Sequence, residues 1–172
     1  MGKVLSTFDK GWPGAISRSV DDIVISLKNV DETPIPFGAP VFLTDTGDGV
    51  VNFIPNGSQT FERFVGFAVR APEKTPDTYP TGQDMTIGQG SQAADWKPGD
   101  IVEILVRGSV VVRAFAGFRV GGKVYIRKSD GTLVSNPGSE GTTVWLENVR
   151  MKQPQRGSGN TSEVVVTERN LL

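Results

Sequence analysis

The sequence from Asp100 to Phe115 constrains the fold most strongly, because it favours extended structure and suits a helix poorly. Its alternate positions carry apolar, mostly β-branched side chains: Val102, Ile104, Val106, Val110, Val112 and Ala114. Successive strand side chains point to opposite faces, so this set shares one face if the alternation continues through Gly108. A two-residue hairpin at Gly108-Ser109 would break that pattern by placing Arg113 among the apolar residues. We predict one long strand bent at Gly108, with a three-residue turn centred on Gly108 as the alternative.

Short strands separated by turns account for most of the remaining chain. The predicted strands are Ile23–Lys28, 41–44, 50–54, 64–70, 84–87, 123–128, 132–135, 143–151 and 163–168. Ser129-Asp130-Gly131 is a typical tight turn and predicts a hairpin between the strands on either side of it. No amphipathic helix of convincing length is present. The pattern therefore predicts an all-β fold, an antiparallel sandwich or barrel-like domain.

The ends and long loops of this domain are defined by turn-forming residues. Residues 1–22 include Gly11-Trp12-Pro13-Gly14 and show no clear alternation, which predicts an extended N-terminal arm. Residues 23–172 are expected to form a single all-β domain. Within it, residues 71–99 are rich in Pro, Thr, Gly and Gln and predict a long loop excursion that ends in a turn at Trp96 to Asp100.

Composition argues against an enzyme. The 172 residues include no cysteine and no histidine, which removes thiolate and imidazole chemistry and nearly all zinc and copper sites. Carboxylate catalysis stays open through Asp21-Asp22, Asp31-Glu32 and Asp84, but neighbouring acids on a strand point to opposite faces. We expect these acids to be solvated. The sequence predicts no catalytic residues, no cofactor and no metal.

The charge balance and the apolar runs exclude two further partner classes. Eighteen Lys and Arg residues against nineteen Asp and Glu residues give a net charge of -1, so there is no electrostatic basis for binding DNA or RNA. No apolar run approaches the roughly 20 residues that span a bilayer, and no signal peptide is evident. We expect neither nucleic acid nor a membrane as a partner.

Two motifs imitate ligand sites. Residues 45–49, Asp-Thr-Gly-Asp-Gly, superficially resemble a calcium loop but lack the alternating ligands and distal glutamate of an EF-hand, so we interpret them as a turn. Residues 88–93 imitate part of a dinucleotide fingerprint without its strand and helix context.

The three tryptophans are better candidates for contact residues, because aromatic side chains carry much of the energy of cores and interfaces. Trp145 lies in a predicted strand and is expected in the core or in a same-face cluster. Trp12 and Trp96 lie in the predicted arm and turn, where docking on another surface competes with local packing. Sugar stacking is a third possibility for them.

The chain resembles the cement, or decoration, proteins of tailed-phage heads from about Gly11 to Leu172. The resemblance lies in the order of short turn and strand signatures across nearly the whole chain. They are Gly11-Trp-Pro-Gly-Ala-Ile-Ser-Arg18, Asp21-Asp-Ile-Val24, Pro34-Ile-Pro-Phe-Gly-Ala-Pro-Val41, Phe64-Val-Gly-Phe-Ala-Val-Arg70, Tyr79-Pro80, Pro98-Gly-Asp100, Val106-Arg-Gly-Ser-Val110, Gly122-Lys-Val-Tyr125 and Val144-Trp-Leu-Glu-Asn-Val149. The family has no catalytic residues to transfer.

This resemblance implies a structural protein that is made in the host cytoplasm and added to the outer surface of the capsid. It implies binding to the major capsid protein where capsomers meet, assembly as a homotrimer, and bracing of the shell against internal DNA pressure. We expect six residues of the arm and the long loop region to make capsid or subunit contacts: Trp12, Pro13, Ile16, Arg18, Tyr79 and Trp96. The competing hypothesis is a carbohydrate- or receptor-binding β-module that uses Tyr79 and an exposed Trp96.

Overall fold

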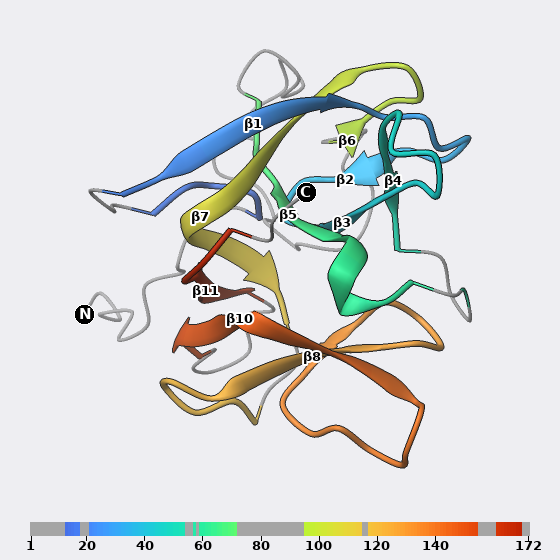
Figure 1. The fold of residues 1–172 in the computed structure, drawn as a ribbon. Coiled ribbons are helices and arrows are strands. Elements are labelled where there is room, and N and C mark those ends of the chain that lie inside the picture. Colours follow the sequence, from blue (N-terminus) through green and yellow to red (C-terminus); the bar gives the residue numbers. More distant parts are fainter. Residues whose placement is uncertain are drawn as a thin grey trace, which may run out of the picture.

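The computed structural model of the chain describes residues 13–17, 21–53, 57, 59–71, 95–114, 117–154 and 161–169. The regular secondary structure of this described part consists of strands, apart from one turn of 3-10 helix at Phe61–Arg63 (Figure 1). The strands are β1 (Ile23–Lys28), β2 (Ile35–Pro36), β3 (Pro40–Leu43), β4 (Val50–Asn52), β5 (Phe64–Ala68), β6 (Asp95–Trp96), β7 (Ile101–Arg113), β8 (Lys123–Arg127), β9 (Leu133–Val134), β10 (Thr143–Gln153) and β11 (Thr161–Val166).

All neighbouring strands pair antiparallel, as the sequence predicted. The main sheet has the order β4-β3-β5-β7-β11-β10-β8-β9, with β1 paired to β7 as well, and β2 pairs with β6 in a separate small sheet. The main sheet curls, so that the chain just after β1 meets β4: Asn29 and Val50 form an isolated parallel bridge, and the Val30 N–H donates to the Val50 carbonyl at 3.1 Å. The fold is therefore an antiparallel, curled β-sheet that resembles part of a barrel.

Strand β7 is the common element of both halves of the sheet. It runs without interruption through 13 residues, and Gly108 adopts a φ of +119° within it. Positive φ is readily available to glycine alone, so Gly108 lets the strand turn sharply without ending. Figure 1 shows β7 passing beneath β1 and then bending toward β11. The prediction of one long bent strand is confirmed, and the alternative of a turn at Gly108 is wrong.

The bend divides the apolar face of β7 between two cores. Before Gly108, Val102, Ile104 and Val106 belong to the second core, which also contains Ile35, Phe37, Val41, Val50, Val65, Ala68, Ala71 and Trp96. After Gly108, Val110, Val112 and Ala114 belong to the first core, where Leu105 joins them from the opposite face of the strand. The predicted apolar set is buried throughout, but it does not face a single core, because the backbone rotates at the glycine.

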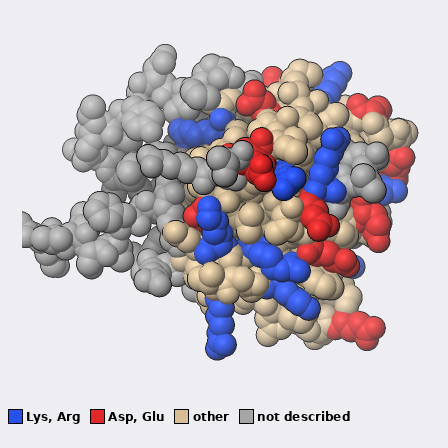
Figure 2. Space-filling view, turned by 60° about the vertical axis from the view of Figure 1, so that its left-hand side comes forward, with Lys and Arg blue, Asp and Glu red and all other residues tan. Residues whose placement is uncertain are grey.

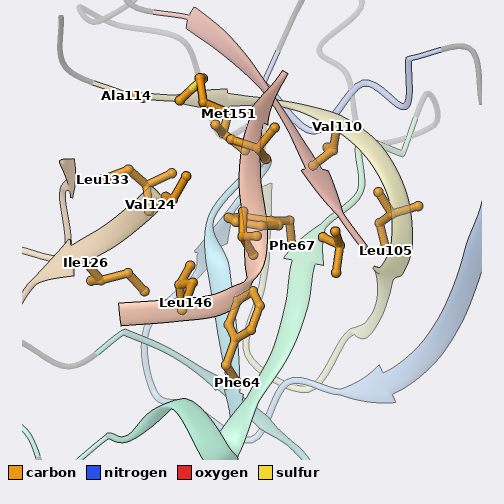
Figure 3. Close-up of a cluster of buried hydrophobic side chains, with 14 of the residues drawn as sticks. Phe64, Phe67, Leu105, Val110, Ala114, Val124, Ile126, Leu133, Leu146 and Met151 are labelled. Atoms are coloured by element: carbon orange, nitrogen blue, oxygen red, sulfur yellow. The ribbon is translucent and has the colours of Figure 1, made fainter. Parts of the chain in front are cut away.

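The first core fills the space between the two halves of the sheet. Figure 3 shows Phe64 and Phe67 of β5 beside side chains from the C-terminal strands, including Leu146 and Met151 of β10. Phe64 and Phe67 are fully buried, and their ring centroids lie 5.4 Å apart in an edge-to-face arrangement. Such aromatic pairs contribute about 0.5–1.5 kcal/mol beyond the burial of their area. This core holds the N-terminal and C-terminal strands together.

The predicted hairpin across Ser129-Asp130-Gly131 is confirmed. Strands β8 and β9 pair antiparallel, with Tyr125 opposite Val134 and Ile126 opposite Leu133. Two short strands were missed: β2 and β6 lie in segments that we predicted as turns, and they pair through Ile35 and Trp96. The predicted strand at 84–87 lies outside the described residues.

The calcium-like sequence at residues 45–49 forms a hydrogen-bonded turn. The hydroxyls of Thr46 and Thr44 each donate to Asp48 Oδ1 at 2.7 Å. These hydrogen bonds, that of Thr46 first, hold the pKa of Asp48 below its ordinary value of 3.8. Asp48 Oδ1 therefore serves as the acceptor that holds this turn together.

Because the folded protein lowers the pKa of Asp48, this group stabilises the fold above the pKa of the unfolded chain, and the contribution is lost as the pH falls through the folded value. We expect Asp48→Asn to flatten the acid limb of the stability curve slightly, since the carboxyl is exposed. Urea unfolding between about pH 6 and pH 2, bracketing the usual aspartate range, measures this. An acid limb as steep as that of the wild type would contradict it.

Candidate interaction surface

Residues 13–17 are held against the bend of β7, although we predicted them to be part of an extended arm. The Gly14 N–H donates to the Val111 carbonyl at 2.8 Å, the Val111 N–H donates to Ala15 at 2.9 Å, and the Ser17 N–H donates to Ser109 at 2.9 Å. Ile16 forms an isolated antiparallel bridge with Val110. The extended arm is not confirmed in this stretch, because its backbone groups are satisfied by β7 rather than by water.

This segment also connects the two arms of the bent strand. The Val69 N–H donates to the Glu103 carbonyl at 2.7 Å, and the Arg70 N–H donates to the Gly14 carbonyl at 2.9 Å. The hydrogen bond from Gly14 to Val111 completes a chain of contacts from the first half of β7 to the second. Gly14 has a φ of +79°, and a Cβ there would lie 2.8 Å from the Arg70 nitrogen, so only glycine fits this approach.

A polar cluster beneath the segment fixes it further. Glu163 of β11 is almost fully buried, and its Oε1 accepts hydrogen bonds from the Ser17 hydroxyl and from Lys152 Nζ, the latter at 2.8 Å. Lys152 also donates to the hydroxyl of the buried Ser109 at 3.1 Å. The cluster joins the segment to β7, β10 and β11. A buried carboxylate needs such partners, because an unpaired charge is costly away from water.

We expect Glu163→Ala to lower the free energy of unfolding by about 1–3 kcal/mol, because it leaves the Lys152 and Ser17 donors without their acceptor. Equilibrium denaturation measures the effect. The control is Asp130→Asn, which removes the charge of an exposed ion pair with Arg127 at 3.0 Å but keeps an oxygen to accept the hydrogen bond from the Thr132 N–H. Its cost should be about 0–1 kcal/mol. Equal losses for the two variants would show that burial of Glu163 contributes nothing.

The predicted contact residues are distributed as follows. Pro13 is buried and lies where the segment meets β7, whereas Ile16 of the same segment is 38% exposed. Trp12, Arg18 and Tyr79 lie outside the described residues. Of the two predicted contact residues of the arm that the structure describes, Ile16 presents an apolar side chain on a backbone that hydrogen bonds hold in place.

Trp96 is buried, which corrects the expectation of an exposed tryptophan at this position. Only 3% of the residue is accessible, and its indole Nε1–H donates to the Val69 carbonyl at 2.9 Å. Its ring packs edge-to-face on Phe37 with centroids 6.0 Å apart. Of the two alternatives for Trp96, docking on another surface or local packing, the structure shows local packing. The carbohydrate-binding hypothesis needed an exposed Trp96, so it loses one of its two aromatic residues.

A surface aromatic pair was only partly anticipated. Trp145 of β10 and Tyr125 of β8 are directly opposite each other, with ring centroids 6.4 Å apart, and Lys123 Nζ lies 4.2 Å from the Trp145 ring centroid. Their strand neighbours Val124, Ile126, Val144 and Leu146 point into the first core. Trp145 thus belongs to a same-face cluster, as one of our two expectations stated. The alternation of β8, with Tyr125 between Val124 and Ile126, was the signal that could have identified its partner.

The surface itself carries mixed charge. Figure 2 shows Lys and Arg side chains interspersed with Asp and Glu on one face, in agreement with the net charge of -1. Within the described ranges, no group of three or more acidic residues is placed to hold a metal ion. No helix in this part of the chain is long and apolar enough to cross a membrane. The described part of the chain is therefore a β-sheet domain in which an exposed apolar side chain, Ile16, is held beside the bend of β7.

Comparison with known proteins defines the class of this β-sheet domain. Residues 3–169 match the family model described as "Structural cement protein (E217 gp24/Pam3 gp6)". The chain therefore belongs to the phage structural cement protein family, whose role is a structural one in the capsid. The resemblance inferred from the sequence is confirmed.

Among solved structures, the chain is similar to one from the capsid of Myoviridae phage XM1. The two share 15% sequence identity with a TM-score of 0.68, over 97% of this chain and 96% of that chain. At this identity the likeness shows a common fold. A comparison with the curated proteins found no significant match.

Proposed function

We propose that the chain binds the outer surface of the phage head where neighbouring capsomers meet, as a homotrimer, and that its main partner is the major capsid protein. It stabilises the shell against the internal pressure of packaged DNA by bridging subunits. Family membership across residues 3–169 is the observation that carries this proposal. Many copies bound to one shell multiply a modest interface into a large total stabilisation.

Ile16 is the described residue best suited to make the contact. It is exposed, yet its neighbours Ala15 and Ser17 are hydrogen-bonded to β7 and Ser17 is fixed to Glu163. A side chain that is already ordered loses less conformational entropy on binding, so more of its burial contributes to affinity. Trp12 and Arg18 flank this segment in the sequence, and with Tyr79 they remain proposed contacts. Pro13 is buried and shapes the segment from inside.

Add-back to heads that lack the protein tests this proposal. Purified wild type and Ile16→Asp are each incubated with such heads, and binding is measured by co-sedimentation. We expect Ile16→Asp to bind roughly tenfold or more weakly, since burying an unpaired carboxylate exceeds the 1.4 kcal/mol that a tenfold change requires. The control is Val120→Asp, at a turn residue that is 72% exposed.

If Ile16→Asp binds heads as tightly as the wild type, residues 13–17 are not part of the interface. Failure of the wild-type protein itself to bind heads would overturn the proposed function. A deletion of residues 1–12 complements the substitution, because it removes Trp12 but leaves residues 13–17 on β7. We expect it to weaken head binding without lowering the unfolding temperature.

A further inference from the structure

Charge is divided unequally between the two halves of the chain, although the net charge of the whole is only -1. The described residues before Gly108 carry five Lys and Arg against ten Asp and Glu, a net charge of -5. The described residues after Gly108 carry eight Lys and Arg against five Asp and Glu, a net charge of +3. Figure 1 shows β1 to β6 in the upper part of the molecule and β8 and β10 in the lower part. We call these the acidic half and the basic half.

The basic half carries two cations side by side on β8 and β10. Lys123 and Arg150 are directly opposite each other in the pairing of these strands. Neither forms an ion pair with a described residue: Lys123 Nζ lies over the Trp145 ring, and Arg150 donates to the main-chain carbonyls of Glu147 and Val149 at 2.7 and 2.9 Å. Like charges directly opposite each other destabilise a sheet. An acidic partner would relieve this repulsion.

The acidic half carries exposed acids that no cation of the described ranges compensates. Glu103 of β7 is exposed and lies opposite Ser26 of β1, and Glu32 is exposed in the turn that follows β1. Neither carboxylate is in an ion pair within the described part of the chain. The two halves thus present unpaired charges of opposite sign.

We propose that copies of this chain associate head to tail, with the basic patch of one copy, Lys123 and Arg150, against the acidic half of the next, through Glu32 and Glu103. This inference rests on the proposed homotrimer and names the surfaces that join its copies. A cyclic trimer repeats one interface between two different patches, so each copy must carry two surfaces that complement each other. The opposite charges of the two halves supply such a pair and also disfavour the reverse arrangement, in which like charges meet.

The salt dependence of self-association is the first test. Sedimentation of the free wild-type protein is measured over a concentration series at about 0.1 M and at about 1 M salt, where the Debye length is roughly 10 Å and roughly 3 Å. We expect assemblies larger than the monomer at the lower salt concentration and their loss at the higher one. A purely apolar contact between copies would not weaken in this way.

Charge reversal tests the two patches. Lys123→Glu/Arg150→Glu makes both surfaces acidic, and Glu32→Lys/Glu103→Lys makes both basic. Each double variant alone should self-associate roughly tenfold or more weakly than the wild type, since like charges that meet in an interface cost more than the 1.4 kcal/mol of a tenfold change. When the two are mixed, each acidic patch meets a basic one, so an affinity tag on one variant should retain the other.

The matched control is Lys28→Glu/Lys97→Glu, which changes the net charge by the same amount as Lys123→Glu/Arg150→Glu. Lys28 and Lys97 are exposed cations of the acidic half, outside the basic patch. This variant should self-associate like the wild type. Urea unfolding of every variant shows whether the fold persists, and the salt dependence of the wild type tests the proposal without any substitution.

Three results would overturn the proposal: a wild type that stays monomeric at both salt concentrations, assemblies that survive the reversal of Lys123 and Arg150, or a control that dissociates as fully as that variant. Head binding is measured separately. A wild type that binds heads without self-association refutes this contact between copies. A wild type that self-associates but does not bind heads refutes the proposed capsid function instead.

Discussion

Replacing Gly108 with alanine should lower the free energy of unfolding by about 2–4 kcal/mol, the sum of a strained positive φ and a steric conflict. Gly108 has a φ of +119°, and a Cβ there would collide with the Asp22 side chain. Either the bend of β7 opens or Asp22 moves away from the strand. Opening of the bend would also disturb the hydrogen bonds between residues 13–17 and the second half of β7. Urea denaturation measures the loss.

Gly99→Ala is the matched control. Gly99 also has a positive φ, of +85°, but a Cβ there would meet nothing within 4 Å. Its cost should therefore be about 1 kcal/mol, from backbone conformation alone. Equal losses at Gly99 and Gly108 would mean that the close packing at the bend has no energetic role.

Truncating Phe67 to alanine should cost about 3–5 kcal/mol, the usual range for removing a fully buried phenylalanine. Phe67 is 0% exposed, packs on Phe64 and lies opposite both Pro40 and Leu105 in the sheet. Its removal leaves a cavity where β3, β5 and β7 meet. Chemical denaturation measures the cost, and the folded fraction is checked by circular dichroism.

Phe61→Ala is the control for this effect, because Phe61 is only partly buried at the edge of the same core. Its loss should be clearly smaller than that of Phe67. If Phe67→Ala unfolds at the same denaturant concentration as the wild type, the first core does not hold the two halves of the sheet together.

The sequence predicted best where local pattern and tertiary environment agree. The strand through Gly108 and the Ser129-Asp130-Gly131 hairpin followed from alternation and turn chemistry, and both are present. It predicted poorly where distant segments decide the structure. β2 and β6 exist because Ile35 and Trp96 meet across the intervening chain, and their own residues favour turns.

The interaction surface was predictable only in part. Pro13 and Ile16 were assigned to one arm. The hydrogen bonds of their segment with Val111 and Ser109 instead fix it on β7, with Pro13 buried and Ile16 exposed. The burial of Trp96 depends on an acceptor at Val69, 27 residues earlier, which no local pattern indicates. The likeness to phage cement proteins rested on the order of motifs across the whole chain, and it was therefore insensitive to such local errors.

Cryo-electron microscopy of the phage head tests the central claim most directly. The account predicts density that fits this curled sheet on the outer surface of the shell, at junctions between capsomers, with residues 13–17 facing the major capsid protein. Heads that contain no copy of the chain, or that carry it only inside the shell, would contradict the account.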